Sequence, residues 1–228
     1  VVGTPGAHDL AAAEESAALL DLHIHRLEIS PTQMVAASQE LAATLRLSQQ
    51  EVEFLLPFWL VAREATHPLL LCGQGADELF GGYPWRYYRA VVNDNFEDYI
   101  DKYYLFWQRL LTNSQLKDVF APIWSDVAHV STRDIFRDVF RHHKDDLQTP
   151  EDYINHSLYF EAKTFMHGLL VVEDKLSMAH GLESRVPFLD NDLVDFAMRC
   201  PVRLKLNNLA EVVRINENEP GNKQAKFF

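Results

Sequence analysis

The sequence is poor in cysteine, in basic residues and in long apolar runs. Its 228 residues include only two cysteines, Cys72 and Cys200. They lie far apart, which argues against a disulfide scaffold and favours a reduced, cytoplasmic protein. The 21 basic residues are outnumbered by 33 acidic ones, for a net charge of −12. A duplex nucleic-acid partner requires a basic face, so we expect no such partner.

Membrane-spanning and secretory signals are missing as well. No stretch approaches the roughly 20 uninterrupted apolar residues of a membrane helix, and the first residues lack the basic start and apolar run of a signal peptide. The sequence also has no internal repeats and no low-complexity tracts. With 47% apolar and 24% charged residues, the composition is that of a soluble globular protein that can bury a substantial core.

The first third of the sequence alternates strand and helix signals. The expected strands are Val1–Thr4, His23–Ile29 and Leu69–Cys72, and the expected helices are His8–Leu22, one that follows Ser30, and one that follows Ser48 and ends near Glu64. The two serines open capping boxes, with Gln33 and Glu51 as their partners. Strands that alternate with helices predict an α/β fold with a parallel, doubly wound sheet.

After Tyr83 the pattern becomes helical. Aromatic and aliphatic residues recur at helical spacing in Asn95–Leu111 and Arg133–His142, Thr149–Asp152 opens a helix that runs toward Leu170, and Asp192–Met198 is amphipathic. The tail Asn207–Asn222 is expected to be a loop. No strand signal of comparable strength occurs here, so we expect an α/β nucleotide-binding portion at 1–83 and a mainly α-helical portion of the same domain at 84–228.

A glycine-rich loop follows the last expected strand directly. It reads Gly73-Gln74-Gly75-Ala76-Asp77-Glu78-Leu79-Phe80-Gly81-Gly82. Glycines let the backbone approach a ligand closely, and adjacent carboxylates are suited to hold Mg²⁺ against phosphate oxygens. The alternative is a tight turn whose acids complement a helix dipole. Because doubly wound sheets bind ligands at the carboxyl ends of their strands, the position favours a nucleotide site.

A second segment makes the interpretation more specific. Asp174–Asp190 (DKLSMAHGLESRVPFLD) resembles the second signature block of the asparagine synthetase family, and Leu71–Tyr83 resembles its "LSGEGADELFGGY" loop. Two long motifs in the family's order are far more specific than one glycine pattern. The chain is therefore identified as part of the ATP-dependent synthetase domain of such an enzyme. The resemblance implies a sheet of the ATP-pyrophosphatase (adenine nucleotide alpha hydrolase-like) type.

The resemblance also implies a reaction, two cofactors and several partners. The family uses ATP and Mg²⁺ to adenylate a carboxylate, with aspartate as the first candidate, and ammonia from a glutaminase domain then displaces AMP. The family's "SGGxDS" loop belongs before Val1, and its phosphate-contacting lysine belongs after Phe228. We therefore expect a piece of a longer enzyme that is inactive by itself. A homodimer is compatible with the resemblance.

The glycine loop would supply the nucleotide site of such an enzyme. By resemblance, Cys72, Gly73 and Gly75 would form the wall of the AMP site through their backbones. Asp77 would be a Mg²⁺ ligand at the pyrophosphate. Glu78 would support the same metal region, with a helix-start role as its alternative.

Gln74 would be catalytic but departs from the family pattern, because many members have Glu there. A neutral Gln cannot act as a general base, although it can hydrogen-bond the acyl group. The departure leaves two further interpretations open. One keeps the chemistry on another acid, such as a surface-sugar uronate, a peptide or a ring-closing substrate. The other is a non-catalytic nucleotide-binding scaffold.

Several other residues carry alternatives. Lys175 would face the nucleotide or pair with Asp174 on a helix surface, and Glu183 with Arg185 would form an ion pair that shapes the pocket wall. Tyr83 would border the substrate or pack as a core aromatic.

The histidines give weaker signals. His23 and His25 share one strand face, which provides two metal ligands but no evident third. His180 lies inside the second motif and is the histidine most worth following.

Overall fold

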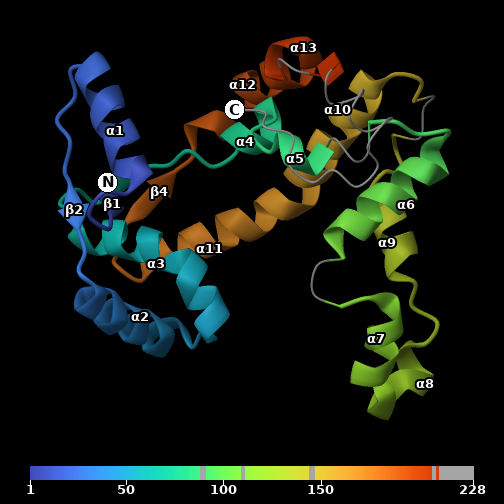
Figure 1. The fold of residues 1–228 in the computed structure, drawn as a ribbon, viewed down its shortest axis with the longest axis horizontal. Helices are drawn as coiled ribbons and strands as arrows, with labels where there is room; N and C mark the ends of the chain where they lie inside the picture. Colours follow the sequence, from blue (N-terminus) through green and yellow to red (C-terminus); the bar gives the residue numbers. More distant parts are fainter. Residues whose placement is uncertain (88–90, 109–110, 144–146, 207–208, 211–228) are drawn as a thin grey trace. The chain divides into compact units, whose positions relative to one another are not determined.

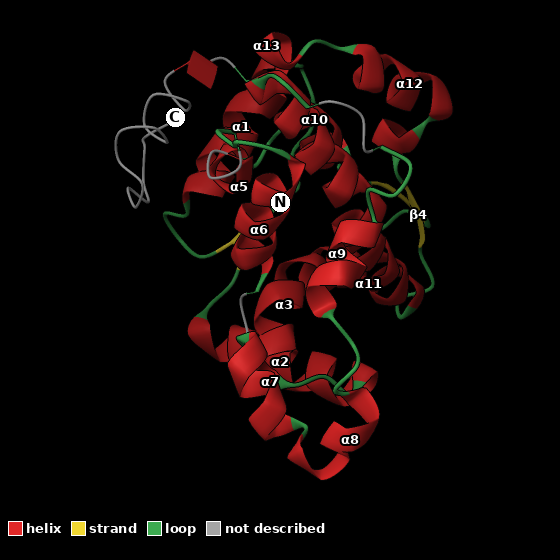
Figure 2. Ribbon diagram, turned by 90° about the vertical axis from the view of Figure 1, so that its right-hand side faces the viewer, coloured by secondary structure: helices red, strands yellow, loops and turns green. Residues whose placement is uncertain are grey.

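The computed structural model describes residues 1–87, 91–108, 111–143, 147–206 and 209–210, and helices account for most of them (Figures 1 and 2). The chain divides by its internal contacts into two units. The first unit consists of Val1–Cys72 and Gly168–Pro187, and the second of Gly73–His167 and Phe188–Phe228. The boundary that we predicted after Tyr83 divides one family domain into an α/β portion and a helical portion. It is a different division from these two units, and it stays a prediction.

The first unit holds all the described strands. Its elements are β1 (Val2–Gly3), α1 (His8–Leu19), β2 (Leu27–Glu28), α2 (Pro31–Leu45), α3 (Gln49–Glu64), β3 (Leu69–Leu71), most of α11 (Met166–Met178) and β4 (Glu183–Arg185). Strand β1 pairs in parallel with β2, and β3 pairs in parallel with β4. The α/β class is confirmed, and the doubly wound arrangement stays a prediction.

The helix starts follow the capping signals in the sequence. The Ser30 backbone N–H donates to Gln33 Oε1 over 2.9 Å at the start of α2, and the Ser48 N–H donates to Glu51 Oε2 over 2.8 Å at the start of α3. The hydrogen bonds from Ser48 lower the pKa of Glu51. Both predicted capping boxes are confirmed.

Two strand expectations need correction. The strand predicted at His23–Ile29 is limited to Leu27–Glu28, because only these residues pair with β1. Strand β4 falls in the portion that we expected to be helical. Its residues, Glu-Ser-Arg, carry no strand signal, and its pairing with β3 over Leu69–Leu71 holds them extended.

The first unit has an aliphatic core. Helices α2 and α3 lie side by side (Figure 1) and bury apolar residues together with one side chain of α11. The buried members are Ile29, Ala37, Leu41, Val52, Leu56, Trp59, Leu60 and Leu176. Burial of apolar surface contributes about 25 cal/mol per Å² to stability. This core, rather than the local capping boxes, is therefore the main source of stability for these helices.

The second unit is helical and has an aromatic core. Its elements are α4 (Ala76–Phe80), α5 (Pro84–Tyr87), α6 (Phe96–Trp107), α7 (Asn113–Val119), η2 (Ala121–Ile123), α8 (Trp124–Val127), α9 (Thr132–Asp138), α10 (Pro150–Phe160), η3 (Glu161–Phe165), most of η4 (Pro187–Leu189), α12 (Asn191–Arg199) and α13 (Val202–Lys205). The largest buried cluster contains Tyr99, Ile100, Tyr103, Tyr104, Phe136, Phe140, Tyr153 and Phe160. Helix α10 continues through the π-helical turn η3 into α11, well beyond the predicted Leu170.

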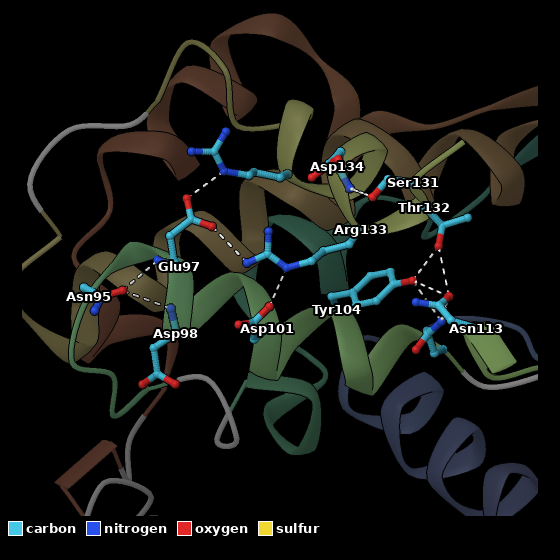
Figure 3. A network of polar contacts seen from close by, with 12 residues as sticks. Asn95, Glu97, Asp98, Asp101, Tyr104, Asn113, Ser131, Thr132, Arg133 and Asp134 are labelled. Carbon is cyan, nitrogen blue, oxygen red and sulfur yellow. Dashed lines mark hydrogen bonds and ion pairs between the residues drawn. The ribbon is translucent and has the colours of Figure 1, made fainter. Parts of the chain in front are cut away.

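A polar network fastens α6 to α9 at the surface of this core (Figure 3). Arg133 of α9 donates to Glu97 over 2.9 Å and to Asp101, both on α6. Farther along α6, the Tyr104 hydroxyl donates to Asn113 Oδ1 over 2.9 Å. Apolar periodicity predicted α6 and α9 but not α7, η2 and α8, whose residues are all at least partly exposed.

None of the described helices is both long and apolar enough to cross a membrane. The predicted loop Asn207–Asn222 lies outside the described residues, apart from residues 209–210.

Candidate functional site

The glycine loop begins where β3 ends. The Cys72 N–H continues the β3–β4 ladder by donating to the Arg185 carbonyl over 2.8 Å. Cys72 is the last residue of that part of the first unit, and Gly73 opens the second unit. The loop therefore emerges from the carboxyl end of a parallel strand, as predicted.

Packing requires two of the loop's glycines. Gly75 caps α4 with φ +93°, and a Cβ on it would lie 2.3 Å from Leu189 Cδ2. A Cβ on Gly82 would lie 2.0 Å from Asp77 Oδ1. Gly73 differs, because a Cβ there would meet nothing within 4 Å. Local packing therefore explains Gly75 and Gly82 but leaves Gly73 beside open space.

The two adjacent carboxylates have different environments. Glu78 is only 1% exposed, and its carboxylate accepts hydrogen bonds from the Gly75 N–H at 3.2 Å and from the Tyr83 hydroxyl at 3.1 Å. Asp77 is exposed to solvent. Glu78 thus stabilises the loop through internal hydrogen bonds, and Asp77 is the carboxylate that a cation from solvent can reach.

Asp77 could hold a magnesium ion jointly with a substrate. No group of three or more His, Cys, Asp or Glu residues that could hold a metal occurs within the described part of the chain. Mg²⁺ commonly binds through one or two carboxylates plus substrate phosphates, so an all-protein cage is not required. The exposed Asp77 meets that need.

Gln74 and Tyr83 complete the loop. Gln74 is half-buried, and its side chain makes no hydrogen bond to any other described residue. Burial, with the carboxylates of Glu78 and Asp77 nearby, raises the pKa of Tyr83 well above its ordinary value. The phenol is therefore a proton donor to Glu78, and the packed role weighed for Tyr83 is the one that its contacts support.

A buried cation holds Tyr83 in place. The Arg86 guanidinium lies 3.6 Å from the Tyr83 ring centroid and 4.4 Å from that of Phe165. It donates through Nη1 to Glu161 Oε2 over 3.2 Å. Arg86 is 7% exposed and Glu161 is 0% exposed, so this ion pair is fully internal to the second unit.

Glu161 opens the π-helical turn η3 and also accepts a hydrogen bond from the Tyr103 hydroxyl at 3.1 Å. Burial raises the pKa of Glu161 to about 7, against the opposing effect of Arg86. π-Helical turns and perturbed carboxylates are frequent at functional sites. Here they anchor the segment that supports the loop.

In the first unit, Cys72 takes part in a second set of polar contacts, with Ser184 and Glu173. The Ser184 hydroxyl of β4 donates to Glu173 Oε1 of α11 over 2.6 Å, and Cys72 Sγ lies 3.2 Å from Ser184 Oγ. Burial, together with Glu173, raises the pKa of the Cys72 thiol to about 11. A thiol that stays protonated is not a nucleophile, and the backbone role of Cys72 stays a prediction.

The second motif lies in the first unit as far as Pro187, and its last three residues, from Phe188 to Asp190, lie in the second. Glu183 and Arg185 form the predicted ion pair, at 2.6 Å, and both are exposed. Lys175 has no ion-pair partner among the described residues. It lines a cavity of about 570 Å³ together with Arg46 and Phe54.

Within the described residues, the histidines belong to no group that could hold a metal ion. The His180 ring packs 4.2 Å from that of Trp59, and burial lowers its pKa. His23 and His25 are exposed and precede β2 rather than sharing a strand face. The two-ligand arrangement suggested for them was therefore wrong, because that segment is not a strand.

Local sequence patterns did not predict roles for Arg86, Glu161 and Glu173. Arg86 and Glu161 are 75 residues apart, and nothing in either local pattern links them. Glu173 ends the apolar run Leu169–Val172 and is followed directly by Asp174 and Lys175. It therefore looks like the start of a polar stretch, and no local signal marks it as buried.

Comparison with known proteins gives the same family as the two motifs. Residues 1–219 match the family described as Asparagine synthase. Asparagine synthetase (glutamine-hydrolyzing) 1 of Bacillus subtilis is 30% identical over 181 residues, which cover 67% of this chain and 28% of that protein. A putative asparagine synthetase (glutamine-hydrolyzing) 1 of Methanocaldococcus jannaschii is 24% identical over 217 residues, which cover 92% of this chain and 29% of that protein.

The chain thus spans less than a third of the length of these relatives. The match of the family to residues 1–219 nonetheless extends over nearly the whole sequence, through both motifs and both units. The chain belongs to the asparagine synthase family.

Proposed function

We propose that the chain is part of an ATP-dependent amide-forming ligase of the glutamine-hydrolysing asparagine synthase type. The observation that carries this proposal is the loop after β3. Gly75 and Gly82 are required by packing, whereas Gly73 is not, and it lies beside open space close in sequence to the exposed Asp77. An open glycine backbone and an exposed carboxylate at a strand end suit a magnesium–nucleotide complex.

The sheet supports the same proposal. Leu71 of β3 is 71% exposed and Leu69 is 37% exposed, yet parallel sheets are normally covered on both faces. We therefore propose that β3 and β4 belong to a larger, doubly wound sheet of the ATP-pyrophosphatase type. Both cysteines are free, which suits the cytoplasm that we propose as its compartment. A homodimer stays a prediction.

The proposed reaction has two steps. A carboxylate oxygen of the acceptor, aspartate in our proposal, attacks the α-phosphorus of ATP, and the bond from that phosphorus to the bridging oxygen breaks to release pyrophosphate. Ammonia, which we propose comes from glutamine, then attacks the acyl carbon. The bond between that carbon and the phosphate oxygen breaks, AMP leaves with the electron pair, and nitrogen loses a proton.

Each loop residue has a proposed part in this scheme. Asp77 would ligate Mg²⁺, which neutralises phosphate charge when bound. Glu78 would support the metal region indirectly, by holding the loop in place, because its carboxylate already accepts two hydrogen bonds. The Gly75 N–H is donated to Glu78, so its proposed place in the AMP wall is structural, and Gly73 and Cys72 would offer the backbone contacts. Positioning of this kind supplies much of the rate enhancement in such reactions.

Gln74 would orient the acyl group through its amide. It cannot remove the proton that nitrogen loses, so another base must do so. This departure from the family's usual Glu favours a second candidate function, in which the same chemistry acts on an acid other than aspartate.

The test is pyrophosphate release by the full-length gene product with Mg-ATP, aspartate and ammonia or glutamine. We expect aspartate-dependent release that yields asparagine. Asp77→Asn should lower it by about a hundredfold or more, since charge stabilisation by a metal ion is worth several kcal/mol. Asp118→Asn, at an exposed acid of α7, is the matched control and should leave the rate unchanged.

The alternatives predict different results. Release that requires another acid would keep the ligase chemistry and replace aspartate as the substrate. No release with any acid, under conditions in which the protein is folded, would contradict the enzyme and favour a scaffold. Unchanged activity in Asp77→Asn would refute the metal role of Asp77.

A further inference from the structure

Residues 113–132 form a small lobe of the second unit, made of α7, η2, α8 and the start of α9. The lobe has apolar side chains but no buried core, because no residue of α7, η2 or α8 is buried. Its apolar side chains instead line a cavity of about 380 Å³, and they are Leu116, Phe120, Trp124, Val127 and Val130. Protein cores seldom leave voids larger than a water molecule, whereas apolar cavities of this size are typical of ligand sites.

The polar residues of the lining meet at one end of the cavity. Asn113 Oδ1 accepts hydrogen bonds from the Tyr104 hydroxyl at 2.9 Å, from Gln108 Nε2 at 2.6 Å and from the Thr132 hydroxyl at 3.2 Å (Figure 3). Three donors on this oxygen fix the orientation of the amide group. The other end of that amide, Nδ2, has no hydrogen-bond partner among the described residues. Asn113 therefore lines the cavity with an unused donor.

Ser131 adds a second donor beside it. The Ser131 Oγ accepts the Asp134 N–H over 3.2 Å, and its own hydrogen has no acceptor within the described part of the chain. Ser131 directly precedes Thr132, whose hydroxyl is bonded to Asn113. The polar end of the cavity thus offers hydrogens rather than lone pairs, so a ligand that matches it carries an acceptor atom there.

The charge of the lining sets a further condition. None of the described residues that line the cavity is charged. The exposed acids of α7 and α8, Asp118 and Asp126, outnumber the one basic residue there, Lys117. An anion would enter the cavity without a cation to pair with, and a cation would find no carboxylate in the lining. Burial of an unpaired charge is costly, so the ligand should be neutral.

We propose that this cavity binds an uncharged, mainly apolar molecule, namely an aromatic ring that carries a ketone or amide oxygen. The ring would lie against Phe120 and Trp124, and the oxygen would accept hydrogen bonds from Asn113 Nδ2 and Ser131 Oγ. Apolar burial would supply most of the affinity, and the polar end would set the orientation. No residue of the glycine loop is among the described lining residues, so this inference adds a second site and does not rest on the ligase chemistry.

The test uses three probes of one shape with the full-length protein, in titrations followed by saturation-transfer NMR. Acetophenone has the ketone oxygen, isopropylbenzene has no acceptor, and benzoate has a negative charge. We expect acetophenone to bind best. Isopropylbenzene should bind about threefold to tenfold more weakly, which is the value of one neutral hydrogen bond. Benzoate should bind least, because its charge would have no partner.

Asn113→Asp tests the donor. The aspartate keeps an oxygen for Tyr104 and Thr132 and replaces the Nδ2 donor with an acceptor. The affinity for acetophenone should fall by about threefold to tenfold, and the affinity for isopropylbenzene should stay unchanged.

Val130→Trp tests the cavity itself. Val130 is 48% exposed, so a larger side chain can be accommodated while it takes up space in the cavity, and binding of both neutral probes should be lost. Val119→Trp is the matched control. It makes a similar change at a 56% exposed position of α7 that does not line the cavity, and it should bind the probes as wild type does. Thermal unfolding without probe checks that each variant is folded.

Several results would overturn the inference. Folded wild type that binds none of the probes up to their solubility limits would do so, and retained binding in Val130→Trp would place the probes elsewhere. A preference for isopropylbenzene, or an equal loss of both neutral probes in Asn113→Asp, would contradict the hydrogen-bond acceptor. A preference for benzoate would contradict a neutral ligand. None of these measurements involves pyrophosphate release, so the ligase function is tested separately.

Discussion

Arg86→Met should destabilise the protein by about 3–5 kcal/mol at pH 8, because it leaves Glu161 as an uncompensated buried charge. Methionine keeps an unbranched apolar chain between the rings of Tyr83 and Phe165, so packing is largely retained. The 0% exposure of Glu161 means that solvent cannot replace the guanidinium. Urea unfolding at fixed pH measures the loss.

The size of this effect should depend on pH. Burial raises the pKa of Glu161 to about 7, above the 4.5 of the unfolded chain. Between these values the folded protein holds a proton that the unfolded chain has released, so stability falls as pH rises through the window. Without Arg86 the charged form is less favourable still, and the cost of Arg86→Met should be smaller at pH 6 than at pH 8.

Glu161→Gln is the matched variant. Its amide oxygen can still accept the Tyr103 hydroxyl, but it carries no charge. In the Arg86→Met background it should recover most of the lost stability and remove the dependence on pH. Equal destabilisation at pH 6 and pH 8, or no recovery in the double variant, would show that the ion pair is not what Arg86 contributes.

The fold could be predicted where the interactions that specify it are local in sequence. The starts of α2, α3 and α10 were predictable because each capping box places Ser or Thr three residues before its partner. Their hydrogen bonds are local, and all three are present. Strand β4 was not predictable, since Glu183–Arg185 has polar residues and is extended through its pairing with β3.

The candidate site was likewise predictable only where its residues lie close together in the sequence. The loop and its two acids are contiguous, so their chemistry could be predicted from glycine spacing and from the family's motifs. The distinction between Asp77 and Glu78 could not, because it depends on burial and on Tyr83, which only the folded loop brings to Glu78. Arg86 with Glu161, and Glu173 with Cys72, are pairs made across long stretches of sequence. No local pattern encodes them.

Gly75→Ala and Gly73→Ala should have opposite consequences, and together they separate folding from ligand binding in the loop. At Gly75, alanine would adopt a left-handed φ of +93° and bring its Cβ within 2.9 Å of Leu189 Cγ as well as 2.3 Å of Cδ2. We expect a loss of about 2–5 kcal/mol, from roughly 1–2 of backbone strain plus about 1–3 of overpacking. Denaturant unfolding measures it.

Leu189→Ala is the matched second-site change for this strain. It removes both close contacts, so the double variant should be more stable than the sum of the single losses predicts, with only the backbone term left. Strict additivity would show that the Leu189 contact contributes nothing, and a fully stable Gly75→Ala would contradict the left-handed cap itself.

Gly73→Ala should affect ligand binding rather than folding. A Cβ there meets nothing within 4 Å, so Gly73→Ala should change stability by no more than about 0.5 kcal/mol. If the nucleotide lies against this backbone, the added methyl group should still lower pyrophosphate release by about tenfold or more, a cost of roughly 1.4 kcal/mol in binding or catalysis. A stable, fully active Gly73→Ala enzyme would place the nucleotide elsewhere. A stable but inactive one would show that this glycine is kept for the ligand, because packing around it leaves room for a side chain.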